Sequence, residues 1–162
     1  MAAVDYFLKI DGVDGESLQK GHEKEIEVMS FSFGLTNAGS FSGGGGGGSG
    51  KAAFQDLHFT TSINKSSPKL FLASATGEHI KTALFTARKA GKTQLEYYTI
   101  KLTDVLVSSY QNGGADGSDV LPTDQFALNY SKIEISYKAQ KADGSLDAAI
   151  KAGYDLKAGQ KI

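Results

Sequence analysis

Along most of this chain, apolar side chains alternate with polar ones, and short turns rich in glycine and aspartate separate the alternating runs. A period of two places the apolar side chains on one face of a β-strand. The runs that show it are residues 4–10, 25–34, 57–63, 80–88, 94–110, 126–137 and 150–156. With only two prolines in the chain, this pattern predicts a mainly β fold: a small closed β-barrel of two packed antiparallel sheets with one short docked α-helix.

The run 25–34 has one bulky face and one small polar face. Its odd positions hold Met29, Phe31 and Phe33, and its even positions hold Ser30, Ser32 and Gly34. Side chains two residues apart lie on the same face of a strand, so the two sets are expected to point in opposite directions. Ile26 and Val28 fall on the even positions, which makes the separation incomplete.

The run 126–137 changes phase near its middle. Apolar residues occupy even positions up to Tyr130 and odd positions from Ile133 onward. This slip predicts a bulge or bend near Ser131 and Lys132.

The predicted helix begins at Ser67 and Pro68. Serine caps free amides at a helix start, and proline suits the first helical position. Gly77 is expected to end the helix. The residues expected to turn inward are Leu70, Phe71 and Ala73.

A glycine-rich loop is expected at about residues 39–51. The segment from Gly45 to Lys51 matches the Walker phosphate-binding pattern except at its last position, where Ala52 has no hydroxyl for magnesium. The residues that follow contain no helical stripe, although a phosphate loop opens a helix. A long loop that orders on assembly is therefore the favoured interpretation.

Length and composition limit the classes of protein to which this chain can belong. At 162 residues the chain is expected to form a single domain, 1–162, and without cysteine it has no disulfide, thiolate zinc site or cysteine nucleophile. Seventeen basic and eighteen acidic side chains argue against a nucleic-acid partner. The N-terminus lacks a signal-peptide pattern, and no apolar run is long enough to span a membrane. A soluble cytosolic chain is therefore expected. Export by a machine that ignores signal peptides stays an open alternative.

The motifs of catalysis and metal binding are absent, so we expect neither an enzyme nor a cofactor. His22 lacks the second histidine of a zinc helix and is predicted to be solvated in a charged turn, and His58 and His79 are also isolated. No G-x-S-x-G elbow occurs. The paired carboxylates are interpreted as solvated charges. These pairs are Glu23 with Glu25 and Asp116 with Asp119.

Several long motifs, in order, closely resemble the Hcp (haemolysin-coregulated protein) family, the tube proteins of the bacterial type VI secretion system. They are EIEVMSFSFG, the glycine loop, SSPKLFLASATGEHI, ARKAG, the run from Glu96 to Ser109 ending in KLTDVLVSS, and QKADG. The resemblance spans nearly the whole chain. Members often carry tryptophan where this sequence has Phe31 and Phe33, a departure that keeps the aromatic face.

The resemblance implies that six copies close into a ring and that rings stack into a tube propelled by a contractile sheath. It also implies a spike protein at the tube tip, small effector proteins carried in the ring lumen, and export to the extracellular space or a target cell without a signal peptide. No membrane insertion is implied.

Two sets of residues are candidates for these contacts. We expect a ring or subunit contact from the flexible loop, at Gly43, Gly44, Gly45, Gly46, Gly47, Gly48, Ser49 and Gly50. We expect a lumen or cargo surface at Ser30 and Ser32, which are small, polar and opposite the phenylalanine face.

Two other classes of function stay open. The first is a soluble ligand- or carbohydrate-binding β-domain with an aromatic pocket, which the lack of tryptophan disfavours. The second is a nucleotide-dependent enzyme built on the glycine loop, which Ala52 disfavours. Strands occupy nearly the whole chain, so a fused toxin domain is not expected.

Overall fold

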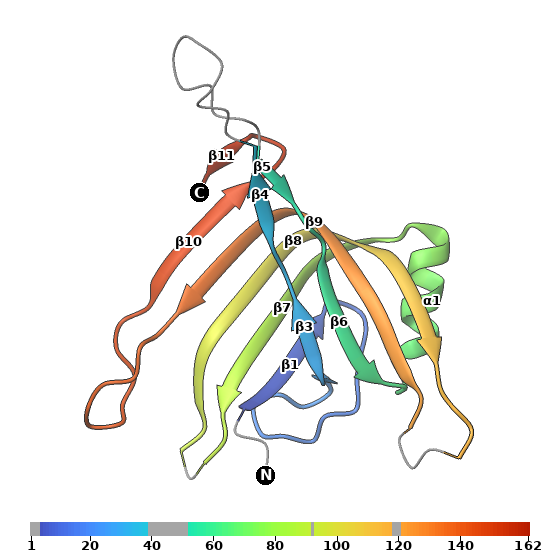
Figure 1. Cartoon of the computed structure of the whole chain (residues 1–162), viewed down its shortest axis with the longest axis horizontal. Coiled ribbons are helices and arrows are strands. Elements are labelled where there is room, and N and C mark those ends of the chain that lie inside the picture. The colour runs from blue at the N-terminus through green and yellow to red at the C-terminus, as the bar shows by residue number, and fades with distance from the viewer. Residues whose placement is uncertain (1–3, 39–51, 92, 118–120) are drawn as a thin grey trace.

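The computed structural model describes residues 4–38, 52–91, 93–117 and 121–162. The described residues form a mainly β structure with one helix, so the predicted fold class is confirmed (Figure 1). The strands are β1 Val4–Ile10, β2 Ile26–Val28, β3 Ser30–Ser32, β4 Leu35–Asn37, β5 Ala52–Phe54, β6 Leu57–Ser62, β7 His79–Lys89, β8 Leu95–Gly113, β9 Thr123–Tyr137, β10 Ile150–Asp155 and β11 Gln160–Lys161. The helix is α1 Ser67–Thr76.

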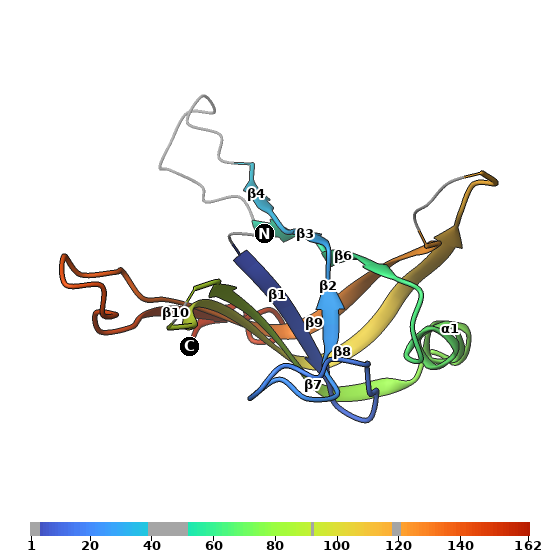
Figure 2. The same ribbon diagram turned by 90° about the horizontal axis from the view of Figure 1, so that it is seen from below.

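All strand pairs are antiparallel and form two sheets among the described residues. One is nine-stranded, with the path β11-β10-β9-β8-β7-β1-β2, and β6 joins β9 and β3 beside this path. The other contains only β4 and β5. The closed barrel of the sequence prediction is not shown, because the hydrogen-bonded path has two open ends, at β2 and β11. Figure 2 shows β10 and the segment that precedes it extending away from β1, β2 and α1.

The core lies between the long strands and the segment that contains β1, β2 and β3. Phe85 at its centre is fully buried. Its ring centroid lies 4.3 Å from that of Phe31, 5.6 Å from that of Tyr6 and 5.8 Å from that of Phe59. Burial of one such side chain contributes about 1.5–3 kcal/mol, so this aromatic cluster is a principal stabilising contact of the fold.

A bend at Met29 divides the single strand expected at 25–34 into β2 and β3. Before the bend Ile26 and Val28 are buried, and after it Phe31 packs against the core. The Met29 amide donates to the Thr60 carbonyl at 2.8 Å, so the chain passes here from pairing with β1 to pairing with β6. The change of phase at this bend explains why apolar residues occupy even positions before Met29 and odd positions after it.

A second bend crosses three neighbouring strands at Asp104. The β7–β8 and β8–β9 registers both skip this residue, and its φ of 54° lies in the left-handed region. The inward positions change from even to odd along each strand. The buried residues on either side of the change are Ile80 and Ala83 in β7, Leu102 and Val105 in β8, and Tyr130 and Ile133 in β9.

The irregularity predicted near Ser131 and Lys132 is therefore confirmed as a bend. The Ser131 hydroxyl donates to Asp104 Oδ2 at 2.8 Å and also lies 3.2 Å from the Thr103 carbonyl oxygen. Thr103 pairs with Lys132 and Val105 with Tyr130, so the register is the same on both sides and no residue is inserted. The register of this strand pair shifts elsewhere, between Val107 and Ser109.

The helix forms where the sequence predicts it, with two differences in detail. Gly77 ends it with a φ of 68°. Ser66 rather than Ser67 is the N-cap residue, and the Ser67 hydroxyl instead donates to the buried Asp124 of β9. The prediction that Phe71 turns inward is wrong, because 59% of this residue is exposed. Leu70 and Ala73 alone of the three are buried, since they face β8 on one narrow side of a short helix.

The bend at Asp104 should be sensitive to the residue type and to pH. Asparagine tolerates the left-handed region better than alanine does, so at pH 7 the melting temperature should fall in the order wild type, Asp104→Asn, Asp104→Ala. Thermal unfolding followed by circular dichroism measures this order. Equal melting temperatures for the two variants would show that the left-handed backbone is not important here.

The pH dependence follows from the carboxylate. The hydrogen bond from Ser131, followed by His79 and the nearby charge of Lys157, lowers the pKa of Asp104 below its ordinary value. A carboxyl with a lowered pKa in the folded state stabilises the fold above its unfolded-state pKa, and this contribution is lost as the pH falls below about 4. The stability difference between wild type and Asp104→Asn should therefore shrink between pH 6 and pH 3. A constant difference over this range would contradict the assignment.

Candidate functional site

One exposed polar face runs across β3, β6 and β9. Ser30 pairs with Thr60 and Ser32 pairs with His58. Residues directly opposite each other in antiparallel strands project to the same face of the sheet. The adjacent positions on the other face are Phe31, Phe59 and Phe126, which pack in the core. Ser30 and Ser32 are thus exposed and opposite the phenylalanine face, as the alternation predicts.

The polar face is nearly free of charge. On β9, Gln125 lies opposite Thr60. The carboxylate beside these residues is Asp56, which accepts hydrogen bonds from Ser108 Oγ at 2.5 Å and Asn129 Nδ2 at 2.8 Å. A surface of small hydroxyl and amide groups can form hydrogen bonds with many partners, and it does not require that a partner carry a particular charge.

Below this face, Tyr130 fixes the chain just before β6. Its hydroxyl donates to the Gln55 carbonyl oxygen at 2.7 Å. Burial raises the pKa of the Tyr130 hydroxyl, and the negative charge of Asp56 adds to the effect. The hydroxyl therefore remains protonated and available as a donor at neutral pH.

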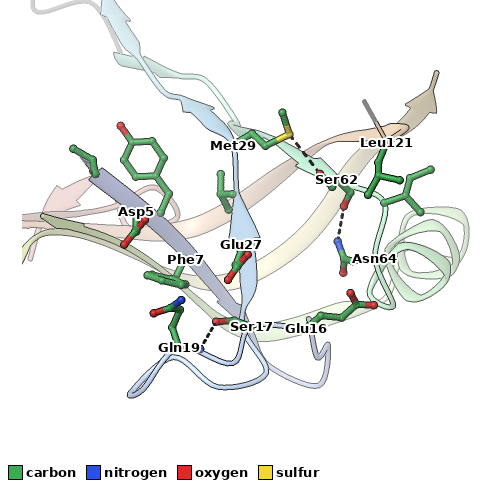
Figure 3. A pocket seen from close by; sticks show the side chains of 14 residues that line it. Asp5, Phe7, Glu16, Ser17, Gln19, Glu27, Met29, Ser62, Asn64 and Leu121 are labelled. Atoms are coloured by element: carbon green, nitrogen blue, oxygen red, sulfur yellow. Dashed lines mark hydrogen bonds between the residues drawn. The ribbon is translucent and has the colours of Figure 1, made fainter. Parts of the chain in front are cut away.

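A groove of about 640 Å³ lies beside the outer edge of β2 (Figure 3). Its walls come from β1, β2, the loop after β1, and the residues that follow β6. Three carboxylates line it, those of Asp5, Glu16 and Glu27, and no lysine or arginine is among its described lining residues. Met29 and Leu121 add exposed apolar surface. Because Asp5 is paired with Arg88, the acidic character of the groove comes mainly from Glu16 and Glu27.

The prediction that His22 is solvated is wrong. Its exposed fraction is 5%, and its ring stacks on Phe7 with centroids 4.4 Å apart. Nδ1 lies 2.9 Å from Glu25 Oε1 and Nε2 lies 2.5 Å from Glu96 Oε1. The ring thereby ties the loop after β1 to the start of β8. Glu96 is far away in the sequence, so no local pattern could have shown this contact.

Arg88 lies on the same Phe7 ring and is almost completely buried. Its guanidinium carbon is 4.7 Å from the ring centroid. Its Nη2 donates to Gln19 Oε1 at 3.2 Å and to Asp5 Oδ2 at 3.4 Å. A buried charge of this kind needs such partners, so the cluster fixes the loop that forms one wall of the groove.

The structure brings together two of the residues considered for chemistry, His22 and Glu25. Within the described ranges, no group of three or more histidine, cysteine, aspartate or glutamate side chains could hold a metal ion. His58 and His79 are exposed, and Asp119 lies outside the described residues. Of the carboxylates interpreted as solvated, Glu23 is exposed, whereas Glu25 contacts His22.

The candidate loop from Gly43 to Gly50, with Ser49, also lies outside the described residues. The segment after it, Ala52–Phe54, is strand β5 and pairs with β4. A phosphate loop would be followed by a helix at this point.

In the described part of the chain, the helix α1 is too short and too polar to cross a membrane.

Comparisons with known proteins agree with this architecture. The family model described as "Type VI secretion system effector, Hcp" matches residues 7–137. The protein hcp1 of Pseudomonas aeruginosa is 46% identical over 157 residues, which cover 96% of each chain.

Solved structures give the same result. The structure of a type six secretion system protein superposes with a TM-score of 0.93 at 31% identity, covering 99% of this chain and all of the other. Hcp1 from Salmonella typhimurium superposes with a TM-score of 0.81 at 33% identity and the same coverage.

Proposed function

The chain belongs to the Hcp family of type VI secretion system proteins, and on this premise we propose that six copies close into a ring and that rings stack into the inner tube that a contractile sheath propels. It is a structural protein of the secretion system rather than an enzyme. The observation that supports self-assembly most directly is the nine-stranded sheet, in which β2, β3 and β11 each pair with only one other strand among the described residues. Open sheet edges are natural sites for pairing with another chain.

The proposed partners follow from this role. They are other copies of the chain, a spike protein at the tube tip, the contractile sheath, and small effector proteins held in the lumen. We place the protein in the cytoplasm during assembly and outside the cell after firing. The whole of 1–162 acts as a single domain, with the loop at about 39–51 as an assembly contact.

The ring lumen is proposed to be lined by the polar face with Ser30 and Ser32. Its small uncharged groups suit a carrier, since they leave space and offer hydrogen bonds to different effectors. The opposite face of these strands packs in the core and therefore cannot line the lumen.

The first prediction concerns the assembly itself. Native mass spectrometry of the purified protein should show a species of six chains, and negative-stain images of the same sample should show closed rings. A strict monomer at all concentrations would contradict the proposal and favour a ligand-binding β-domain.

Replacing Ser32 with glutamine should weaken effector binding and leave the ring intact. The longer side chain fills space on the polar face without contacting the core. We expect a loss of at least about tenfold in affinity, as a steric conflict or unpaired amide of about 1.4 kcal/mol or more would give. Isothermal titration with an effector exported by the same system measures it.

The matched control is Ser145→Gln, at an exposed serine in the turn between β9 and β10. This variant should bind the effector as the wild type does. Equal binding by Ser32→Gln and the control would reject the lumen assignment.

Removing Gly43–Gly48 should weaken assembly more than folding. Shortening a loop changes the free energy of loop closure by only about 0.6 kcal/mol per halving of its length, so the melting temperature of the monomer should change little. The fraction of rings, measured by analytical ultracentrifugation, should fall. Normal rings with unchanged thermal stability would refute the role of the loop in assembly.

A further inference from the structure

The groove beside β2 exists because the chain changes its pairing partner at Met29. Before this residue β2 pairs with β1, and after it β3 pairs with β6. β6 continues along β9 as far as Ser62. β2 and the end of β6 therefore separate, and the space between them is the groove that Figure 3 shows.

Glu27 occupies a gap in the hydrogen bonding along the outer edge of β2. The Glu25 carbonyl accepts the Ser17 amide at 3.1 Å on one side of the gap. On the other side, the Met29 amide donates to the Thr60 carbonyl at 2.8 Å. Backbone groups point alternately to the two sides of a strand, so the amide and carbonyl of Glu27 point the same way as these groups. They have no backbone partner there among the described residues.

The carboxylate of Glu27 lacks a partner as well. Of the other carboxylates that line the groove, Asp5 pairs with Arg88, and Glu16 accepts the Lys65 amide at 3.0 Å. Glu27 is exposed, and no lysine or arginine is among the described lining residues. One residue thus offers two kinds of acceptor to the groove, a carboxylate and a backbone carbonyl.

Apolar side chains flank these acceptors. Figure 3 shows Glu27 between Phe7 and Leu121, with Met29 at one end of the groove. The exposed fractions of Met29 and Leu121 are 53% and 68%. Acceptors beside apolar surface match a long cationic side chain, which has an aliphatic stem and a head that donates hydrogen bonds. Arginine fits better than lysine, because its planar guanidinium has five donors and can reach a carboxylate and a carbonyl together.

The groove continues the polar face of β3, β6 and β9. His58, Thr60 and Ser62 alternate along β6 and therefore lie on one face of it. Thr60 is opposite Ser30 on that face. Ser62 lines the groove, and its hydroxyl lies 3.8 Å from Met29 Sδ, to which it donates. A partner that lies on the polar face can therefore extend into the groove.

We propose that the groove binds an arginine side chain of a small effector protein that lies on the polar face. The guanidinium donates to the carboxylate and the backbone carbonyl of Glu27, and the aliphatic stem packs on Met29 and Leu121. This inference rests on the proposed carrier function. It adds a requirement that the uncharged polar face does not impose, since only an effector with a suitably placed basic residue can make this contact.

Methyl NMR tests the contact, because Met29 is one of only two methionines in the chain. The probe is the acetylated peptide amide Leu-Arg-Leu, which is added to assembled rings with isotope-labelled methionine methyl groups. The Met29 signal, identified by its loss in Met29→Leu, should shift until it saturates. The control peptide carries citrulline, which has the shape of arginine without its charge, and should bind several-fold more weakly.

Glu27→Gln removes the charge and keeps the size of the side chain. It should weaken binding of the arginine peptide about fivefold, the factor that a partly exposed ion pair of about 1 kcal/mol gives. The matched control is Glu78→Gln, at an exposed carboxylate that follows α1 and does not line the groove. This control should bind the peptide as the wild type does.

The same measurement with an effector exported by the same system tests the identity of the occupant. The effector should shift the Met29 signal, and Glu27→Gln should lower its affinity by a similar factor. Glu78→Gln should leave its affinity unchanged. This result, together with the response to the arginine peptide, would support the inference.

The contrary outcomes separate this inference from the proposed function. Equal affinities of wild type and Glu27→Gln for the peptide and the effector would reject the groove contact, while loss of effector binding in Ser32→Gln would leave the carrier function standing. A Met29 signal that changes when rings stack, and then ignores the peptide, would show that another copy fills the groove and would overturn the effector as its occupant. Rings that bind the peptide but no effector would overturn both proposals.

Discussion

Every amide and carbonyl in a buried strand needs a hydrogen-bond partner, and the architecture follows from how the long strands meet this requirement. β9 pairs with β8 along most of its length, while its other edge pairs first with β6 and then with β10. A straight sheet could not satisfy these pairings and also enclose the rings around Phe85. The bend at Asp104 allows β7, β8 and β9 to curve together without losing register.

The alternation of apolar residues predicted most of the strands and the bend near Ser131, and Ser67, Pro68 and Gly77 predicted the helix, because these features depend on neighbours in the sequence. The hairpin of β4 and β5 and the short strand β11 were not predicted, since three or fewer residues carry no measurable period. His22 was misjudged for a different reason. Its partner Glu96 and the stacked ring of Phe7 come from other strands, and only folding brings them together.

The features of the candidate site were likewise predictable only in part. Ser30 and Ser32 could be assigned to the face opposite Phe31 from alternation alone, and the structure places them there. The acidic groove could not be predicted, because its lining comes from β1, β2, the loop after β1 and the end of β6.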